Sequence, residues 1–507
     1  MQHTNNGKIA KNTLLLYFRM LFVMGVSLYT SRVVLKIMGI DDFGIYQSVG
    51  GIVGMLTFIN ASLSTGTSRF ITFELGRNDY ERLGKTFSTI VSLQLILIVI
   101  IVLAAETIGV WFVNNKLKIP ADTHLAALVA YHLSIVTTAV SLLAVPYLAV
   151  IIAHEHMNVF AYLGIYEVCA KLGIVYLLTV GDYNRLIFYA FLLLVIQISL
   201  TSFYIVYCTK NFGECHYRPM LNRSIFKEVV GFSSWSLFAS SSIALNNQGI
   251  LVLLNMFFSP AVVTARTISL QVNNAANQFV TNFRTAVNPQ IVKQYASGNV
   301  EGSKSLLLAS TKYSYYMMFL LSLPICLGAK PLLEIWLEEV PDYTVVFLQI
   351  VIVQSLFQVF DTSFYTVLYA KGDLKLNALI SPTVGFMMFP IVYLMFKFGA
   401  SPIALSWASL IMYALLGLVI KPLLIIKIAD YHWSDILMVF KPCLVITVIS
   451  AGMAYLLTSR ISHSGIAGLI LIVIVCLAVS VPTIYFFGLT PAMRKKIVSV
   501  ISSRIHS

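Results

Sequence analysis

Membrane-length apolar segments recur along the whole chain and constrain its fold more than any other feature. About fourteen segments are long enough to cross roughly 30 Å of hydrocarbon at about 1.5 Å per residue. Apolar residues make up 58% of the 507 residues and charged residues only 11%, which excludes a soluble domain with a charged surface. The sequence predicts an all-α polytopic membrane protein. The predicted spans lie near residues 11–35, 43–68, 86–113, 124–153, 157–180, 185–208, 229–258, 260–288, 306–329, 343–370, 376–398, 401–427, 436–458 and 465–488.

The charges in the connections between spans predict the orientation of the chain. Lys and Arg concentrate in alternate connections, whereas an acidic run from Glu334 to Asp342 falls on the opposite side. Since basic loops stay in the cytoplasm, an even number of spans predicts that both termini are cytoplasmic, in a bacterial inner membrane. The net charge of +13 then reflects basic loops and a basic tail beside membrane lipids, and we expect no nucleic-acid partner. The tail, 493–506, is either a basic helix lying on anionic lipid or an ordinary solvated end.

Catalytic and metal chemistry find little support in the sequence. The longest stretch between predicted spans is only about 20 residues, so no separate catalytic domain fits and we predict that the chain is not an enzyme. The six cysteines show neither metal-ligand nor redox spacing, and we predict no metal site and no cofactor other than a coupling ion. Glu167 and Lys171 are four residues apart in the order that favours an ion pair within one helix.

A weak internal repeat predicts how the spans are grouped. Residues 11–100 match residues 231–320 at a shift of about 220, in the order of spans and in a few residues. The simplest organisation is a lobe of six helices over 1–224, a second over 225–430, and two further helices with the basic tail over 431–507. Such repeats place a substrate near the middle of the membrane at the interface of the lobes.

Charged and amide side chains inside the predicted spans indicate where such a substrate binds. Arg19 lies in the middle of the first span, where a guanidinium is costly unless it faces a wet cavity or a structural partner. The eighth span carries a polar stripe whose members fall within about 60° of one another at about 100° per residue. The stripe consists of Arg266, Asn273, Asn277, Arg284 and Asn288.

We interpret this stripe as the lining of a wet pathway that binds an anionic substrate. Two alternatives remain open, since Asn side chains often hydrogen-bond between membrane helices and Arg284 lies near enough to the inner interface to extend toward it.

Asp361 is the clearest acid within a predicted span. It shares a helix face with Gln354, Gln358 and Tyr365. An acid in this position is a candidate to bind the H⁺ or Na⁺ that drives a transport cycle, and a neutral hydrogen-bonded Asp used in packing is the alternative.

Several short segments near the N-terminus resemble a known family. They are Ser31-Arg32-Val33, Met38-Gly39-Ile40-Asp41-Asp42-Phe43-Gly44-Ile45-Tyr46, Leu63-Ser64-Thr65-Gly66-Thr67-Ser68-Arg69 and Gly76-Arg77-Asn78-Asp79-Tyr80-Glu81-Arg82. Together they resemble bacterial polysaccharide flippases of the Wzx type, in the multidrug/oligosaccharidyl-lipid/polysaccharide (MOP) transporter superfamily.

The resemblance implies two six-helix lobes, alternating access and a polyprenyl-diphosphate-linked oligosaccharide as substrate. The pathway would be surface polysaccharide synthesis, such as that of O-antigen in lipopolysaccharide, with a polymerase and glycosyltransferases as possible partners. Related lipid II flippases place arginines of the first and eighth spans in a central cavity, a role that Arg19 and Arg266 fill by position.

Two other functions remain as alternatives. An ion-coupled multidrug exporter of the same superfamily would make Asp361 central, although the cationic stripe argues against it. A membrane glycan polymerase or glycosyltransferase would need acidic loop residues, for which Asp41 and Asp42 are the nearby candidates.

Overall fold

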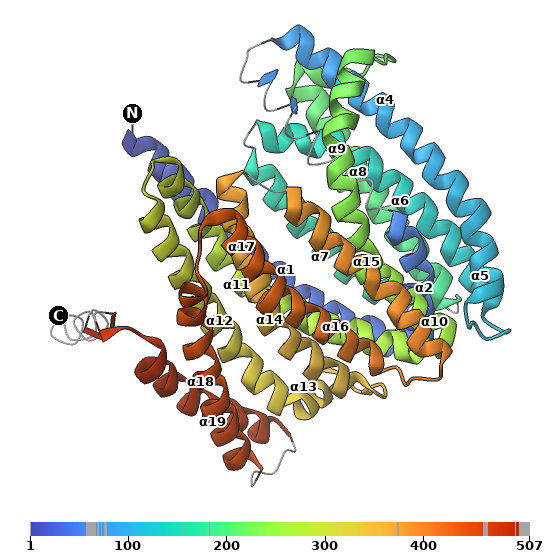
Figure 1. Ribbon diagram of the computed structural model, residues 1–507. Helices are drawn as coiled ribbons and strands as arrows, with labels where there is room; N and C mark the ends of the chain where they lie inside the picture. Colours follow the sequence, from blue (N-terminus) through green and yellow to red (C-terminus); the bar gives the residue numbers. More distant parts are fainter. Residues whose placement is uncertain are drawn as a thin grey trace. The chain divides into compact units, whose positions relative to one another are not determined.

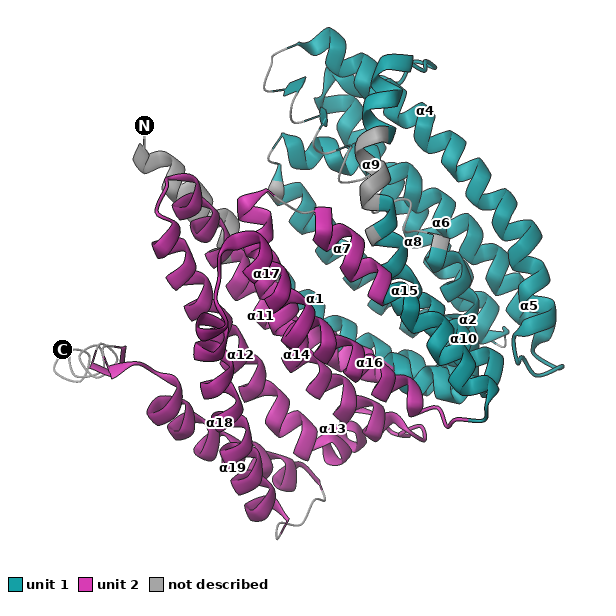
Figure 2. Ribbon diagram, viewed as in Figure 1, with its two compact units in different colours: residues 1–267, 385–399 teal, residues 268–384, 400–507 magenta. Residues whose placement is uncertain are grey.

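In the part of the chain that the computed structural model describes, the regular elements are helices, joined by turns and irregular segments (Figure 1). It describes residues 2–56, 67, 70–71, 74–75, 79–154, 156–181, 183–372, 375–459, 465–491 and 493–495, and only the backbone of residues 2–19, 56, 157, 231–236, 239 and 286. Two compact units are present: residues 1–267 with 385–399, and residues 268–384 with 400–507 (Figure 2). Two of the boundaries between these units, after residues 267 and 384, fall inside helices. The lobe boundaries at 224 and 430 stay a prediction.

The first unit is organised around one central helix, α6. This helix packs against α2, α4, α7 and α8, while α1 lies along α7. The helices of this unit are α1 (Gln2–Met38), α2 (Ile40–Leu56), α4 (Tyr80–Ala104), α5 (Val110–Lys116), α6 (His124–Ala153), α7 (Met157–Leu177), α8 (Arg185–Asn211), α9 (Arg223–Ala244), α10 (Ile250–Phe257), the start of α11 (Pro260–Ala296) and the end of α15 (Lys375–Lys397). A π-helical turn, Ala105–Gly109, joins α4 to α5, and another, Leu245–Gly249, joins α9 to α10.

The second unit is organised around α14. In α14, 61% of the most apolar stretch is buried, against 28% in α18 and in α19, so α14 is central and the last two helices are peripheral. It packs against α12, α16 and α17, and α18 and α19 pack against each other and against α12. The helices are the rest of α11, α12 (Val300–Leu327), α13 (Ala329–Trp336), α14 (Thr344–Lys371), the start of α15 (Lys375–Lys397), α16 (Ala404–Leu415), α17 (Lys421–Ala429), α18 (Trp433–Thr458) and α19 (Gly465–Thr483). Single π-helical turns follow α16, at Leu416–Ile420, and α19, at Ile484–Gly488.

Helix ends follow from local sequence signals. Asp79 and Asn222 cap α4 and α9, because their side-chain oxygens accept hydrogen bonds from backbone N–H groups of the first turn. Gly39 separates α1 from α2 with a φ of 86°, and Gly372 ends α14 with a φ of 79°. Both are left-handed conformations that glycine adopts without steric cost.

Gly44, which belongs to one of the family-like segments, allows a close helix crossing in the first unit. A Cβ at this position would lie 2.1 Å from the backbone oxygen of Pro260. The crossing is fixed by the hydroxyl of Thr264, which donates to the carbonyl of Ile40 over 2.7 Å. Gly44 therefore serves packing between α2 and α11.

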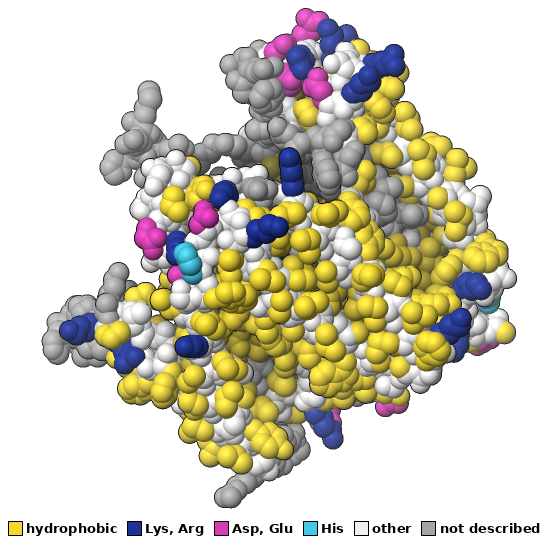
Figure 3. Space-filling model, viewed as in Figure 1, with side chains coloured by type: hydrophobic (Ala, Val, Ile, Leu, Met, Phe, Trp, Pro, Cys, Tyr) yellow, Lys and Arg dark blue, Asp and Glu magenta, His cyan; other side chains and the backbone are white. Residues whose placement is uncertain are grey.

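The surface of the helices is apolar, as expected for a chain that lies in lipid. Large hydrophobic side chains such as Leu103, Ile108 and Leu444 are exposed, and the space-filling view shows hydrophobic side chains over most of the visible face (Figure 3). Within the described residues, ten helices are long and apolar enough to cross a membrane, or eleven if the bent pair α12–α13 forms one span. The chain is a multi-pass membrane protein, and the total of fourteen spans stays a prediction.

Candidate functional site: the polar faces of α11, α14 and α17

The predicted polar stripe of α11 packs against α14 in the second unit. Ser355 of α14 donates its hydroxyl hydrogen to Oδ1 of Asn273 over 2.6 Å and accepts a hydrogen bond from Nδ2 of Asn277 over 3.0 Å. Asn288 and Thr366 make a longer contact of 3.4 Å farther along the same two helices. Asn273 is 5% exposed and Ser355 is fully buried. In this conformation the two amides that we predicted to bind substrate join helices, which was the alternative reading of the stripe.

A different polar face of α11 is exposed. It comprises Asn274, Gln278, Thr281 and Thr285, at offsets of 0, 4, 7 and 11, which keep the side chains within about 60° of one another. Asn274, Gln278 and Thr285 each follow a residue of the packed stripe directly. Because successive residues of a helix are about 100° apart, the exposed face is turned from the packed face by roughly 100°. The two threonines donate to carbonyls of their own helix, and Gln278 donates to Asn282 over 3.3 Å. In the eighth span predicted from the sequence, exposed amides indicate contact with water.

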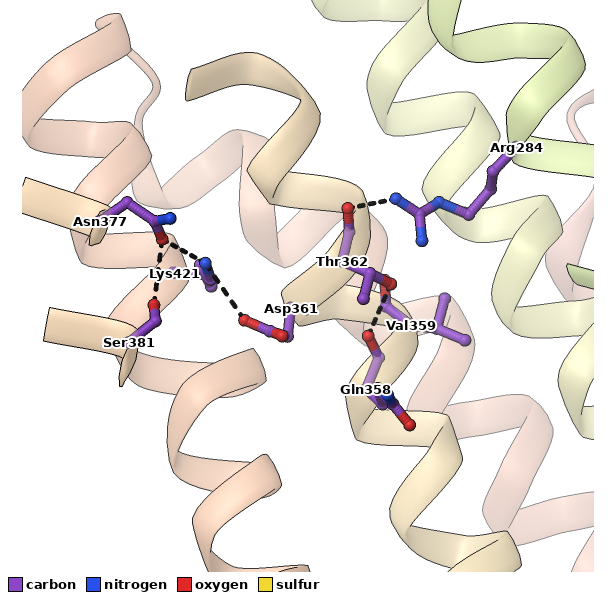
Figure 4. A network of polar contacts seen from close by, with 8 residues as sticks. All are labelled: Arg284, Gln358, Val359, Asp361, Thr362, Asn377, Ser381 and Lys421. Carbon is purple, nitrogen blue, oxygen red and sulfur yellow. Dashed lines mark hydrogen bonds and ion pairs between the residues drawn. The ribbon is translucent and has the colours of Figure 1, made fainter. Parts of the chain in front are cut away.

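Arg284 is partly buried and belongs to the packed face of α11. Its guanidinium donates to the main-chain carbonyl of Thr362 in α14, and Thr362 in turn donates its hydroxyl hydrogen to the carbonyl of Gln358 over 2.8 Å (Figure 4). The negative charge of Asp361 also acts on Arg284. A carbonyl uses only part of the hydrogen-bonding capacity of a guanidinium, which has five N–H donors.

Asp361 faces a lysine that the sequence analysis did not single out. Nζ of Lys421, at the start of α17, lies 3.3 Å from Oδ1 of Asp361 and also donates to Oδ1 of Asn377 in α15 (Figure 4). Ser381 donates to the same Asn377 oxygen over 3.0 Å. The side chain of Lys421 is 3% exposed and that of Asp361 18%, so the pair is largely shielded from water. A lysine inside the predicted span 401–427 was the available signal, because the rule applied to Arg19 applies equally to it.

The other two predicted arginines lie in the first unit. Arg266, near the start of α11, is 4% exposed. Arg19 belongs to α1, and its side chain lies outside the described residues. Asp41 and Asp42, the candidate acids for an enzymatic function, occupy the first turn of α2, where negative charge favours the helix N-terminus.

A charged cluster marks the end of the first unit at which α4 begins. Arg82 pairs with Glu74 over 3.0 Å and reaches Glu228 of α9 at 3.7 Å. The same end carries a cavity of about 410 Å³ lined by Asp79, Glu81, Arg82, Lys85, Asn222, Ser224, Ile225 and Glu228. These residues overlap a family-like segment, which therefore contributes an ion-pair network in this part of the structure.

Comparison with solved structures identifies the arrangement of helices. A lipid II flippase, MurJ, in an inward closed conformation matches with a TM-score of 0.70 and 12% identity, over 94% of this chain and 98% of the flippase. An inward-facing multidrug resistance transporter of the MATE family, in the MOP superfamily, matches with a TM-score of 0.65 and 14% identity, over 82% and 96%. The chain has the MOP fold.

Further MOP-fold structures match at similar identity. A MOP superfamily transporter from Pyrococcus furiosus Vc1, whose binding pocket is described as reversed in polarity and suggestive of a different function, matches with a TM-score of 0.58 and 14% identity, over 81% and 93%. No family model matches the sequence, and no curated protein matches it. The MOP fold thus rests on the three-dimensional likeness.

Proposed function

We propose that the protein is a flippase that moves a polyprenyl-diphosphate-linked oligosaccharide from the cytoplasmic to the outer leaflet of a bacterial inner membrane. Both termini would lie in the cytoplasm, and the cycle would use alternating access. The observation that carries the proposal is the match over 94% of this chain to a lipid II flippase, against 82% for the multidrug transporter. The additional length of chain matched by the flippase is similar to the length of the two peripheral helices α18 and α19. The flippase structure therefore accounts for more of the chain.

The chemistry of α11 supports an anionic, sugar-bearing substrate. Arg284 retains donors beyond the one that binds Thr362, and guanidinium groups bind phosphate oxygens through paired hydrogen bonds. The exposed amides and hydroxyls on the neighbouring face suit sugar hydroxyls. We assign the phosphates to Arg284 and the sugars to the exposed face that begins at Asn274, and Arg19 and Arg266 stay predicted contacts of the substrate.

Transport of the oligosaccharide would be completed by other proteins. A lipid-linked product on the outer leaflet is consumed when a polymerase or glycosyltransferase of a surface polysaccharide pathway removes or extends the sugar. This consumption would give the flippase its direction.

The test is transfer of a fluorescent undecaprenyl-diphosphate oligosaccharide across proteoliposomes that hold the purified protein. Wild type should transfer the lipid, and Arg19→Ala, Arg266→Ala and Arg284→Ala should each reduce the rate by at least about tenfold, since each removes a charge-assisted contact worth about 1.5–3 kcal/mol. Lys293→Ala is the matched control, because it removes one exposed cation from the last turn of the same helix. Full activity in all three arginine variants would refute the assigned site.

An ion-coupled multidrug exporter is the second candidate. The MATE match and the acid at Asp361 favour it. In the same proteoliposomes it predicts export of an organic cation that depends on a Na⁺ or H⁺ gradient and is lost in Asp361→Asn, with no transfer of the lipid-linked sugar.

A further inference from the structure

Lys421 lies in surroundings that resemble a binding site for a small cation. Its Nζ is 3.3 Å from a carboxylate oxygen of Asp361, donates to the amide oxygen of Asn377, and lies 5.4 Å from the centre of the Tyr365 ring. Carboxylate and amide oxygens are the ligands that hard cations such as Na⁺ accept. The ammonium group therefore occupies the space in which a metal cation beside Asp361 would lie.

The same geometry leaves Asp361 dependent on that ammonium. Within the described part of the chain, Oδ1 of Asp361 accepts no hydrogen bond. The negative charge of this carboxylate is therefore balanced by its ion pair with Lys421. A carboxylate at membrane depth needs a nearby positive charge. Lys421 supplies the charge from within the protein.

Two further contacts hold α17 against α14 and keep Lys421 in place. Nζ of Lys371, at the end of α14, donates to the carbonyl of Ile428 and lies 3.7 Å from Asp430. Lys421 and Ile428 are seven residues apart, which places them on the same face of α17. The helix is thus fixed to α14 near both of its ends.

We propose that Lys421 is the built-in counter-cation of Asp361, and that it excludes Na⁺ from this site so that transport requires no Na⁺ gradient. The proposal concerns ion use in the transport cycle and in that respect rests on the proposed function. It assigns to Lys421 the role that determines ion specificity. Removing the ammonium while leaving space for an ion should create a Na⁺ site formed by Asp361 and Asn377.

The experiment measures Na⁺ binding to the purified full-length protein in detergent by thermal unfolding. Samples contain NaCl or choline chloride at equal ionic strength. Wild type should melt within about 1 °C in the two salts, whereas Lys421→Ala should melt about 2 °C or more higher in saturating Na⁺, because a ligand that binds only the folded state stabilises it.

Three variants act as matched controls. Lys421→Met removes the charge but fills the space with an apolar chain, so it should not respond to Na⁺. Lys421→Ala combined with Asp361→Asn should also lose the response, because the carboxylate is gone. Lys427→Ala removes an exposed cation from the same helix and should behave as wild type.

Two results would overturn the proposal: a saturable Na⁺-specific rise in the melting temperature of wild type, or a folded Lys421→Ala without such a rise. If Lys421→Ala does not fold, the comparison of wild type in NaCl and in choline chloride still tests whether the native site excludes Na⁺. The readout needs no transported substrate, so failure of lipid transfer would refute the proposed function and leave the ion-site result standing.

Discussion

The Ser355 contact distinguishes helix packing from substrate binding at the two amides of α11. In Ser355→Ala, Asn273 loses its 2.6 Å donor and Asn277 loses its 3.0 Å acceptor. Hydrogen bonds between membrane helices average about 0.6 kcal/mol each, and a buried amide oxygen left without a donor costs about 1–3 kcal/mol. We therefore expect Ser355→Ala to lower the free energy of unfolding by about 1–3 kcal/mol.

The matched substitution on the exposed face is Gln278→Ala. This exposed side chain donates to the half-buried Asn282 of its own helix over 3.3 Å, so its removal should change the free energy of unfolding by no more than about 0.5 kcal/mol. If the exposed face contacts sugar, Gln278→Ala should lower the rate of lipid transfer several-fold at unchanged stability. Ser355→Ala should transfer lipid at near wild-type rate when assayed well below its melting temperature.

The assay pairs thermal unfolding in detergent with lipid transfer in proteoliposomes for both variants. The reasoning would be refuted if Ser355→Ala kept wild-type stability but lost transfer, since the buried amides would then act on the substrate and not on helix packing. A loss of stability in Gln278→Ala would equally contradict the assignment of the exposed face.

Three further substitutions test packing in the first unit. Arg82→Ala should destabilise the protein by about 2–3 kcal/mol in thermal unfolding, because it leaves the buried Glu74, whose side chain is 4% exposed, without its ion-pair partner. Glu228→Ala should cost less than about 1 kcal/mol, because the side chain of Glu228 is 46% exposed. Equal effects of the two would show that burial of Glu74 does not govern the network. Gly44→Ala should cost at least about 1–3 kcal/mol or prevent folding, since the new methyl group meets the backbone of Pro260, and an unchanged melting temperature would contradict the close crossing.

Local contacts could be predicted from the sequence because spacing along one helix determines them. The pair formed by Glu167 and Lys171 is confirmed, with 2.6 Å between Oε1 and Nζ. The helical fold is also confirmed, because a helix satisfies the backbone hydrogen bonds of an apolar, membrane-length segment within that segment. The boundaries of helices such as α4 follow from caps that can be read in the sequence.

Contacts between distant helices could not be predicted, because spacing says nothing about which helix lies opposite. The period of α11 places its polar residues on one face, but only the packing of Asn273 against Ser355 of α14 shows that this face is buried. The pairing of Asp361 with Lys421 joins residues 60 positions apart in sequence, and nothing in either helix alone specifies it. From its own helix alone, Asp361 is therefore predicted as an acid without a cation.

The pairing of Asp361 changes the balance between the two candidate substrates. An exporter of organic cations needs an acid whose charge is available to its cargo. Here one carboxylate lies in contact with Lys421 and also within the electrostatic reach of Arg284, so these three groups carry one net positive charge. A cation entering beside α14 would have to displace an ammonium group that is 97% shielded from water, whereas an anion would meet a guanidinium with donors to spare. These three charges support the proposed phosphate-bearing substrate, and Asp361→Asn should weaken lipid transfer less than Arg284→Ala does.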